Sequence, residues 1–234
     1  DYTQAELLSF AENAYGPDKF DTDAVAPVRK VDATTHCLEL WHGPTSAFKD
    51  MALQCLPRFF SASAQALRAR GELDHEFCIL VATSGDTGKA ALEGFKDAPG
   101  VSIGVLFPDG GVSDIQRKQM VTTTGSNVQV WAVRGNFDDC QTGVKRAFSD
   151  EQFAAELLSD YGIALSSANS INVGRLAPQV TYYFDAYAQL VRRGAVRAGD
   201  EVTFCVPTGN FGDVLAGYYA KRLGLPVRRL VVAS

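Results

Sequence analysis

Short runs of apolar, β-branched and aromatic residues alternate with longer amphipathic stretches along the chain. Continuous apolar runs of this kind are typical of strands in a parallel sheet that is covered on both faces. They predict strands at 77–82, 102–107, 128–133, 163–166, 202–206 and 227–233. The stretches between them predict helices at 5–14, 48–70, 87–95, 114–123, 138–149, 151–158, 170–193 and 213–223. Strands that alternate with helices predict an α/β fold.

Two prolines fall inside predicted helices. Pro57 lies within 48–70, and Pro178 lies within 170–193. Proline lacks the N–H group that the helical ladder needs, and its ring clashes with the preceding turn. We therefore expect each proline to kink its helix or to move the helix boundary.

The chain ends in an apolar run, 230–234, which predicts a buried strand with no covering helix after it. A strand in a parallel sheet is normally covered on both faces. On this ground we expect the chain to be an incomplete protein.

Composition and charge narrow the function classes. Hydrophobic residues make up 46% of the 234 residues and charged residues 21%, which is typical of a globular protein and not of a disordered one. The net charge of −5 offers no attraction for nucleic-acid phosphates or an anionic membrane. No apolar run approaches the roughly 20 residues that span a bilayer. We expect a small-molecule ligand, and no nucleic-acid, membrane or obligate protein partner.

Cysteines and histidines favour neither a disulfide framework nor a metal site. The five cysteines are odd in number, widely spread and never spaced as C-x-x-C, so they predict no disulfide set and no zinc ligands. Only three histidines occur, and none belongs to an H-E-x-x-H motif. Unpaired cysteines and the absence of a signal-peptide pattern at the start predict a cytoplasmic location.

Two loops follow a predicted strand and open a predicted helix. One is 83–88, Thr-Ser-Gly-Asp-Thr-Gly, and the other is 207–213, Pro-Thr-Gly-Asn-Phe-Gly-Asp. Glycines let the backbone approach a ligand closely, and a helix N-terminus presents free N–H groups under a positive dipole. Neither loop has the glycine spacing of dinucleotide or P-loop motifs. Each is a candidate cradle for a phosphate or carboxylate, with a tight turn and an N-cap as the alternative.

Lys49 follows a Gly-Pro turn and lies in the first turn of a predicted helix. Desolvation and the positive helix end both disfavour an ammonium group there, and a lysine with a lowered pKa is a nucleophile suited to a Schiff base. The alternative is a solvated lysine whose charge is offset by Asp50.

A polar cluster covers 166–175, Ser-Ser-Ala-Asn-Ser-Ile-Asn-Val-Gly-Arg. Its amide and hydroxyl groups, together with Arg175, could clamp a phosphate. The alternative is an ordinary helix cap at Asn169 or Ser170 with a solvated Arg175. The run 116–119, Gln-Arg-Lys-Gln, could add a cation, although a charged solvent face explains such a run equally well.

Four segments in this order resemble the threonine synthase family: HGPTSAFKD, ATSGDTGKAALEGF, SSANSINVGRL and PTGNFGDVLAGYYAKRLGLP. The resemblance extends from about residue 20 to residue 234 and is closest to the longer branch of that family, because Asp86 stands where related enzymes carry asparagine. It implies a pyridoxal-phosphate enzyme of the tryptophan-synthase-like fold type (fold type II), with the cofactor between two three-layer α/β domains. It further implies a small domain at 73–167 and a large domain at 1–72 and 168–234, the last part truncated.

The resemblance also implies the roles of particular residues. Lys49 would form the Schiff base with pyridoxal phosphate and act as the base at the substrate Cα, without a metal ion. Binding of the cofactor phosphate would fall to Gly209, Asn210, Phe211, Gly212 and Asp213, with Asp86 near the ring hydroxyl. The substrate carboxylate would be received by Ser84, Gly85, Asp86 and Thr87. The substrate phosphate would be recognised by Lys118, Asn169, Ser170 and Arg175, with a shared contribution from Asn210.

The family converts O-phospho-L-homoserine and water into L-threonine and phosphate, by γ-elimination followed by addition of water at Cβ. Two anion sites are therefore expected, and the polar segments supply candidates for both. No residue can be assigned to face the pyridine nitrogen. The alternatives are a sister enzyme of the same fold type, such as a threonine dehydratase or a cysteine synthase, and a relative that binds the cofactor without turnover.

Overall fold

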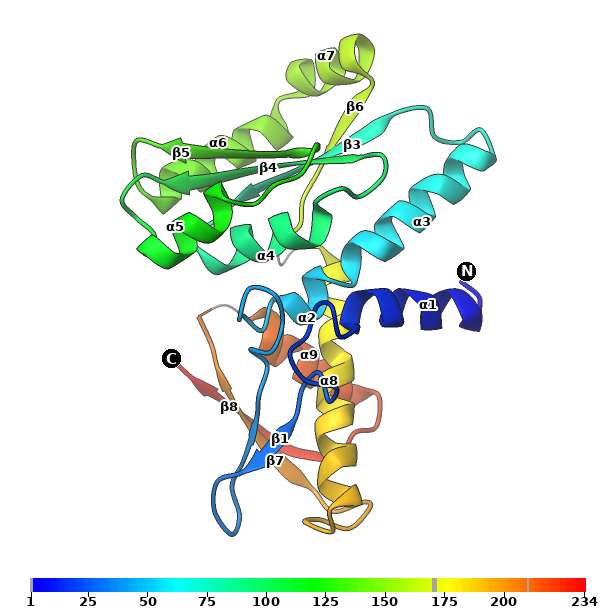
Figure 1. Ribbon diagram of the computed structural model, residues 1–234, viewed down its shortest axis with the longest axis vertical. Coiled ribbons are helices and arrows are strands. Elements are labelled where there is room, and N and C mark those ends of the chain that lie inside the picture. The colour runs from blue at the N-terminus through cyan, green and yellow to red at the C-terminus, as the bar shows by residue number, and fades with distance from the viewer. Residues whose placement is uncertain (1, 170–171, 210) are drawn as a thin grey trace.

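The computed structural model describes residues 2–169, 172–209 and 211–234 (Figure 1). Its helices are α1 Gln4–Tyr15, α2 Asp50–Leu53, α3 Leu56–Ala69, α4 Asp86–Phe95, α5 Asp114–Val121, α6 Phe137–Ser149, α7 Glu151–Tyr161, α8 Val173–Arg192 and α9 Gly212–Arg222. Its strands are β1 Val28–Lys30, β2 His36–Leu38, β3 Glu76–Ala82, β4 Val101–Pro108, β5 Val128–Val133, β6 Ile163–Ser166, β7 Val202–Pro207 and β8 Val227–Ala233. The predicted α/β fold class is confirmed.

A four-stranded parallel sheet forms one part of the molecule, with the strand order β5-β4-β3-β6. Helices α4 and α5 cover one face of the sheet, and α6 and α7 lie on the other (Figure 1). Side chains of the two central strands are buried against α4 and α5, in a core that includes Ile79, Val81, Leu92, Phe95, Ile103, Val105, Phe107 and Met120. Coverage on both faces explains why these strands are continuous apolar runs in the sequence.

The strand order contains a reversal beside β3. From β3 the chain adds β4 and then β5 on one side, and it returns to place β6 on the other side of β3. The loops that follow β3 and β6 therefore leave the same edge of the sheet in opposite directions. In open parallel sheets, ligands bind outside the carboxyl ends of the strands at such a reversal. The topology thus predicts that a ligand binds beside residues 83–86 and 167–169.

The second part of the molecule contains the parallel pair β7-β8, the antiparallel pair β1-β2 and the helices α8 and α9. Its core joins α8, α9 and the β7-β8 pair through residues that include Phe20, Met51, Tyr182, Tyr183, Val206, Val214 and Val227. Figure 1 shows α2 between the two parts, where the chain passes from one to the other. The domain boundaries at 72/73 and 167/168 remain a prediction.

The two prolines behave differently. The predicted helix 48–70 is divided into α2 and α3, and Pro57 lies in the first turn of α3, where its missing N–H group has no helical partner to lose. Pro178 lies inside α8 without ending it. That helix begins at Val173 behind the cap Asn172, later than the predicted start.

Two features of the strands differ from the prediction. The hairpin β1-β2 is missed by the sequence pattern because each strand has three residues and β1 buries only Val28. Strand β8 forms and pairs with β7, but it is not the buried strand that the apolar run predicts. Val231 and Val232 are 43% and 44% exposed. As neighbours in a strand they point to opposite faces, so the described residues leave both faces of β8 uncovered there.

Candidate active site

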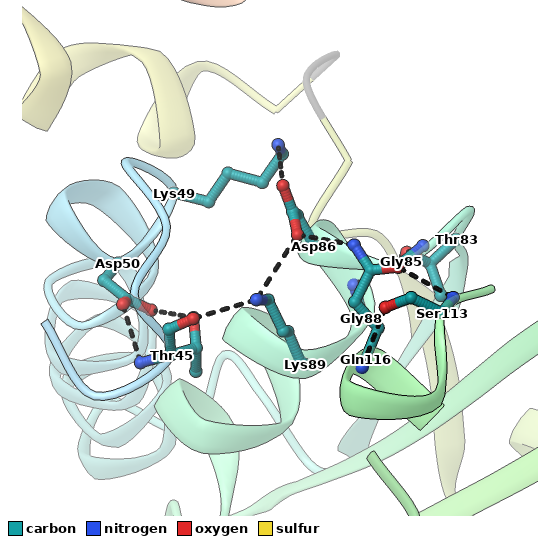
Figure 2. Close-up of polar contacts among 10 residues, drawn as sticks. All are labelled: Thr45, Lys49, Asp50, Thr83, Gly85, Asp86, Gly88, Lys89, Ser113 and Gln116. Atoms are coloured by element: carbon teal, nitrogen blue, oxygen red, sulfur yellow. Dashed lines mark hydrogen bonds and ion pairs between the residues drawn. The ribbon is translucent and has the colours of Figure 1, made fainter. Parts of the chain in front are cut away.

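Lys49 lies at the junction of the two parts, immediately before α2, and not in the first helical turn that the sequence predicts. Its side chain is 12% exposed, and Nζ is 3.7 Å from Oδ2 of Asp86 at the start of α4 (Figure 2). Burial lowers the pKa of Lys49, the Asp86 carboxylate opposes this, and the charges of Arg175 and Lys89 lower the pKa further. Lys49 is therefore a largely buried amine with a lowered pKa, and not the solvated lysine of the alternative.

The loop before Lys49 is held by Asp50. The fully buried Asp50 carboxylate accepts hydrogen bonds from the Thr45 N–H (2.8 Å) and the Thr45 hydroxyl (2.7 Å). A Cβ atom at Gly43 would lie 2.6 Å from Cβ of Asp50, so only glycine fits where the loop passes this carboxylate. Asp50 thus stabilises the loop, and the alternative in which it offsets the charge of Lys49 is wrong.

Asp86 is contacted by donors from three elements. Its Oδ1 accepts a hydrogen bond from Nε2 of Gln116 on α5 (2.9 Å) and lies 3.3 Å from Nζ of Lys89 on α4. Its Oδ2 faces Lys49. Partial burial raises the pKa of Asp86, but the Gln116 hydrogen bond and the two lysine charges outweigh it and lower the pKa below its usual value. An ionised carboxylate therefore lies between two amines.

The loop between β3 and α4 is shaped by Thr83. Its buried hydroxyl oxygen accepts hydrogen bonds from the N–H groups of Gly85 and Gly88, both at 2.9 Å. Gly85 has φ +141°, and a Cβ atom there would lie 2.4 Å from the Gln116 side chain. Glycine is required at this position for both reasons. Ser84 is exposed and Thr87 half-buried, so both hydroxyl residues are placed beside the carboxyl end of β3.

Arg175 projects from the first turn of α8 into the core and is 3% exposed. It donates from Nη1 to the Ala168 carbonyl (3.1 Å), whereas its buried Nε has no partner among the described residues. Burial lowers the pKa of Arg175 to about 10, so the group stays charged at neutral pH. No carboxylate in the described ranges forms an ion pair with it. The alternative of a solvated Arg175 is wrong: it is a buried cation without a counter-ion.

The loop after β6 approaches the loop after β3, as the strand order requires. Nδ2 of Asn169 lies 3.4 Å from the Ala82 carbonyl at the end of β3, and its Oδ1 accepts from the Ser167 hydroxyl (3.1 Å). The cap of α8 is Asn172, whose Oδ1 accepts from the Gly174 N–H, so the alternative of a helix cap at Asn169 or Ser170 is wrong. Ser170, also predicted, lies outside the described residues.

The loop after β7 is anchored by Asp213. The buried Asp213 carboxylate accepts hydrogen bonds from the hydroxyls of Tyr182 (2.6 Å) and Tyr183 (2.7 Å) on α8. Burial, with the Asp213 charge, raises the pKa of Tyr183. Gly209 and Phe211 are exposed, and Gly212 begins α9; Asn210 lies outside the described residues. The Asp213 side chain therefore fixes the start of α9.

Some predicted residues come together and others do not. Lys49 lies beside Asp86, and Arg175 is close enough to lower the pKa of Lys49. Lys118 is exposed on α5, and no ion pair joins its amine to any residue that the structure describes. The sequence analysis missed Lys89, although a lysine three residues after Asp86 is a recognisable helical pair. It also missed the contact of Gln116 with Asp86, which no local pattern encodes.

His42 lies at the start of the loop that leads to Lys49, and its contacts should make the stability of the protein depend on pH. Its Nδ1 lies 2.6 Å from Oδ1 of Asp21 and its Nε2 lies 2.9 Å from Oε2 of Glu39. The hydrogen bond with Glu39, aided by Asp21, raises the pKa of His42. Its contribution to stability should be full below the unfolded-state pKa of about 6.5 and be lost as pH rises through the higher folded-state pKa. The free energies of unfolding of the parent and of His42→Asn, measured with urea from pH 5.5 to 8.5, should converge as the pH rises. A difference between them that does not change with pH would contradict this.

Comparisons with known proteins identify relatives of the chain. No family model matches the chain. It is 46% identical to threonine synthase of Pseudomonas aeruginosa over 98% of its own length. A crystal structure of pyridoxal-phosphate-bound threonine synthase from Brucella melitensis superposes with a TM-score of 0.84, at 45% identity, over 98% of the chain. The chain is a homologue of the threonine synthases.

The likeness covers only part of each relative. This threonine synthase homologue spans 45% of the Pseudomonas protein and 46% of the Brucella chain. It is also 43% identical over its whole length to human threonine synthase-like 1, of which it spans 31%. The fold is that of fold type II threonine synthases. None of the described helices is long and apolar enough to cross a membrane, and the described residues contain no group of three metal-ligating side chains.

Proposed function

We propose that this threonine synthase homologue binds pyridoxal phosphate through Lys49 and belongs to an enzyme that converts O-phospho-L-homoserine and water into L-threonine and phosphate. The observation that carries the proposal is the placement of two groups where the two parts of the molecule meet. One is the Lys49 amine beside the Asp86 carboxylate, and the other is the buried Arg175 cation, which has no counter-ion among the described residues. The first suits a cofactor aldehyde, and the second suits a phosphate.

The residues present fit the cofactor. Lys49 provides an amine whose pKa is already lowered by burial. The loop 207–213 contains no lysine or arginine, so a cofactor phosphate there would be held by backbone N–H groups of Gly209, Phe211, Gly212 and Asp213 and by Asn210, at the positive end of α9. A Cβ atom at Gly209 would meet nothing within 4 Å, which leaves open space beside the loop. When bound, pyridoxal phosphate would supply an electron sink for a carbanion at the substrate Cα.

The residues of the chain have distinct roles in the proposal. The Lys49 amine would accept the Cα proton and return it, since it is a buried amine whose pKa is lowered. The loop 84–87 would receive the substrate carboxylate on its backbone and hydroxyl groups. Arg175, with Asn169 and Ser170, would bind the phosphate that leaves from Cγ, and Lys118 would approach from α5. The start of α4 and Arg175 therefore provide separate places for the two charged ends of the substrate.

The human relative is named threonine synthase-like 1, and this name leaves open whether the reaction is retained. The test is an assay of the full-length protein for phosphate released from O-phospho-L-homoserine, with L-threonine measured in the same samples. Equal amounts of phosphate and threonine are expected. Ammonia released from threonine would assign a dehydratase instead, and cofactor binding without product would assign a binding protein. We propose the cytoplasm as the location, since the cysteines are unpaired.

A further inference from the structure

Lys89 is the second amine at Asp86, and the resemblance assigns it no role. Its side chain is 8% exposed. Nζ lies 3.3 Å from Oδ1 of Asp86 and donates a hydrogen bond to the Thr45 carbonyl at 2.9 Å (Figure 2). A buried ammonium group is costly unless it is paired and hydrogen-bonded, and these two oxygens satisfy it.

The contacts of Lys89 connect the two segments that carry the reactive groups. Thr45 belongs to the loop that leads to Lys49, and its N–H and hydroxyl are bound by the buried Asp50. Asp86 begins α4, and Gln116 on α5 holds the same oxygen that Lys89 contacts. Figure 2 shows these residues as a chain of contacts from Asp50 through Thr45 and Lys89 to Asp86. An ordinary surface pair three residues apart on a helix would explain neither the burial nor the bond to Thr45.

We propose that Lys89 is a positioning residue that competes with Lys49 for the Asp86 carboxylate and compensates the charge of that carboxylate when the Lys49 amine is neutral. The inference rests on the proposed role of Lys49 as the reactive amine. Lys49 must lose a proton before it can attack a carbonyl. Without Lys89, that loss would leave the half-buried Asp86 carboxylate with only the neutral Gln116 beside it, so the ammonium form of Lys49 would be favoured.

The charged groups that face Lys49 predict the direction of the effect. Asp86 favours the protonated amine, whereas Lys89 and Arg175 disfavour it. Lys89→Met removes a positive charge that repels the Lys49 ammonium and partly neutralises Asp86. The attraction between Asp86 and Lys49 is then unopposed by Lys89, so the pKa of Lys49 should rise. A like charge on the other side of a shared, half-exposed carboxylate shifts a pKa by on the order of one unit. The Lys49 amine should then be about tenfold less reactive at a fixed pH below its midpoint.

The experiment measures the reactivity of Lys49 directly. The full-length protein is treated with hydroxylamine to release any bound aldehyde, and its lysines are trace-labelled with acetic anhydride from pH 6 to 11. Peptide mass spectrometry then gives a midpoint for each lysine. This measurement does not depend on the reaction catalysed, so failure of the proposed function and failure of this inference are distinguishable.

One test variant and two control variants are compared with the parent protein. Lys89→Met should raise the Lys49 midpoint by about one pH unit. Lys89→Arg keeps the charge and should keep the parental midpoint. Lys96→Met removes a lysine that pairs with Glu93 beyond the other end of α4 (2.7 Å) and should change nothing at Lys49. If Lys89→Met does not melt cooperatively, Lys89→Gln is used, because its amide can still donate to the Thr45 carbonyl.

Two outcomes would overturn the proposal. The first is an unchanged Lys49 midpoint in a folded charge-removing variant at position 89. The second is an equal rise in Lys89→Arg, which would mean that packing, and not charge, is responsible. A shift confined to the charge-removing variant supports the proposal.

Discussion

Replacing Lys49 with alanine should abolish the proposed turnover while leaving the fold intact. The variant removes both the group that would hold the cofactor and the base at Cα, and general-base catalysis alone contributes about 10²- to 10⁴-fold. We therefore expect at least a ~10³-fold fall in phosphate release from O-phospho-L-homoserine. The free energy of unfolding should change by less than about 1 kcal/mol, because the 3.7 Å contact with Asp86 is partly exposed and offsets the cost of burying the amine.

The control for this prediction is Lys96→Ala. This substitution also removes a paired lysine, but Lys96 follows the opposite end of α4 from Asp86. It should retain turnover. Thermal melting of both variants, measured beside the assay, separates a chemical effect from a folding effect. Near-normal turnover in Lys49→Ala would exclude the proposed mechanism.

Replacing Arg175 with methionine should separate the two anion sites. Methionine keeps much of the apolar stem but removes the buried charge. Loss of one charge-assisted contact to a phosphate costs about 1.5–3 kcal/mol, so affinity for O-phospho-L-homoserine should fall by roughly tenfold to a hundredfold. Affinity for pyridoxal phosphate should be nearly unchanged, since the loop 207–213 would bind it through the backbone.

The same substitution should leave the ligand-free protein close to its parental stability. Among the described residues, the Arg175 side chain makes one hydrogen bond, to the Ala168 carbonyl, and its Nε has no partner. The loss of that bond is offset by removal of a buried, unpaired charge. The control is Arg192→Met on the same helix, an exposed residue near Asp185, which should affect neither ligand. Equal weakening of both ligands would show that Arg175 serves the cofactor phosphate.

The elements of the sheets could be predicted from local sequence. The strands at 77–82, 102–107 and 128–133 are found within a residue of their predicted bounds. Each is an apolar run that ends in glycine, proline or a polar turn. The two central strands, 77–82 and 102–107, are apolar throughout because helices cover both faces of the sheet there. Tertiary contacts were needed for the hairpin β1-β2, because three-residue strands are too short to show a period.

The candidate site was only partly predictable: the lowered pKa of Lys49 was expected from the sequence, but the charged neighbours that help to set it were not. Local motifs identified Lys49, the glycine loops and Arg175, because the backbone conformations and residue types that bind anions are encoded within a few neighbouring residues. Only the tertiary structure decided that Asp86 is shared by Lys49, Lys89 and Gln116 and that Asp50 binds Thr45. It also decided that Arg175 is buried, with no counter-ion in the part of the chain that the structure describes. A side chain's burial and charged neighbours come from segments far apart along the chain, and they set its pKa.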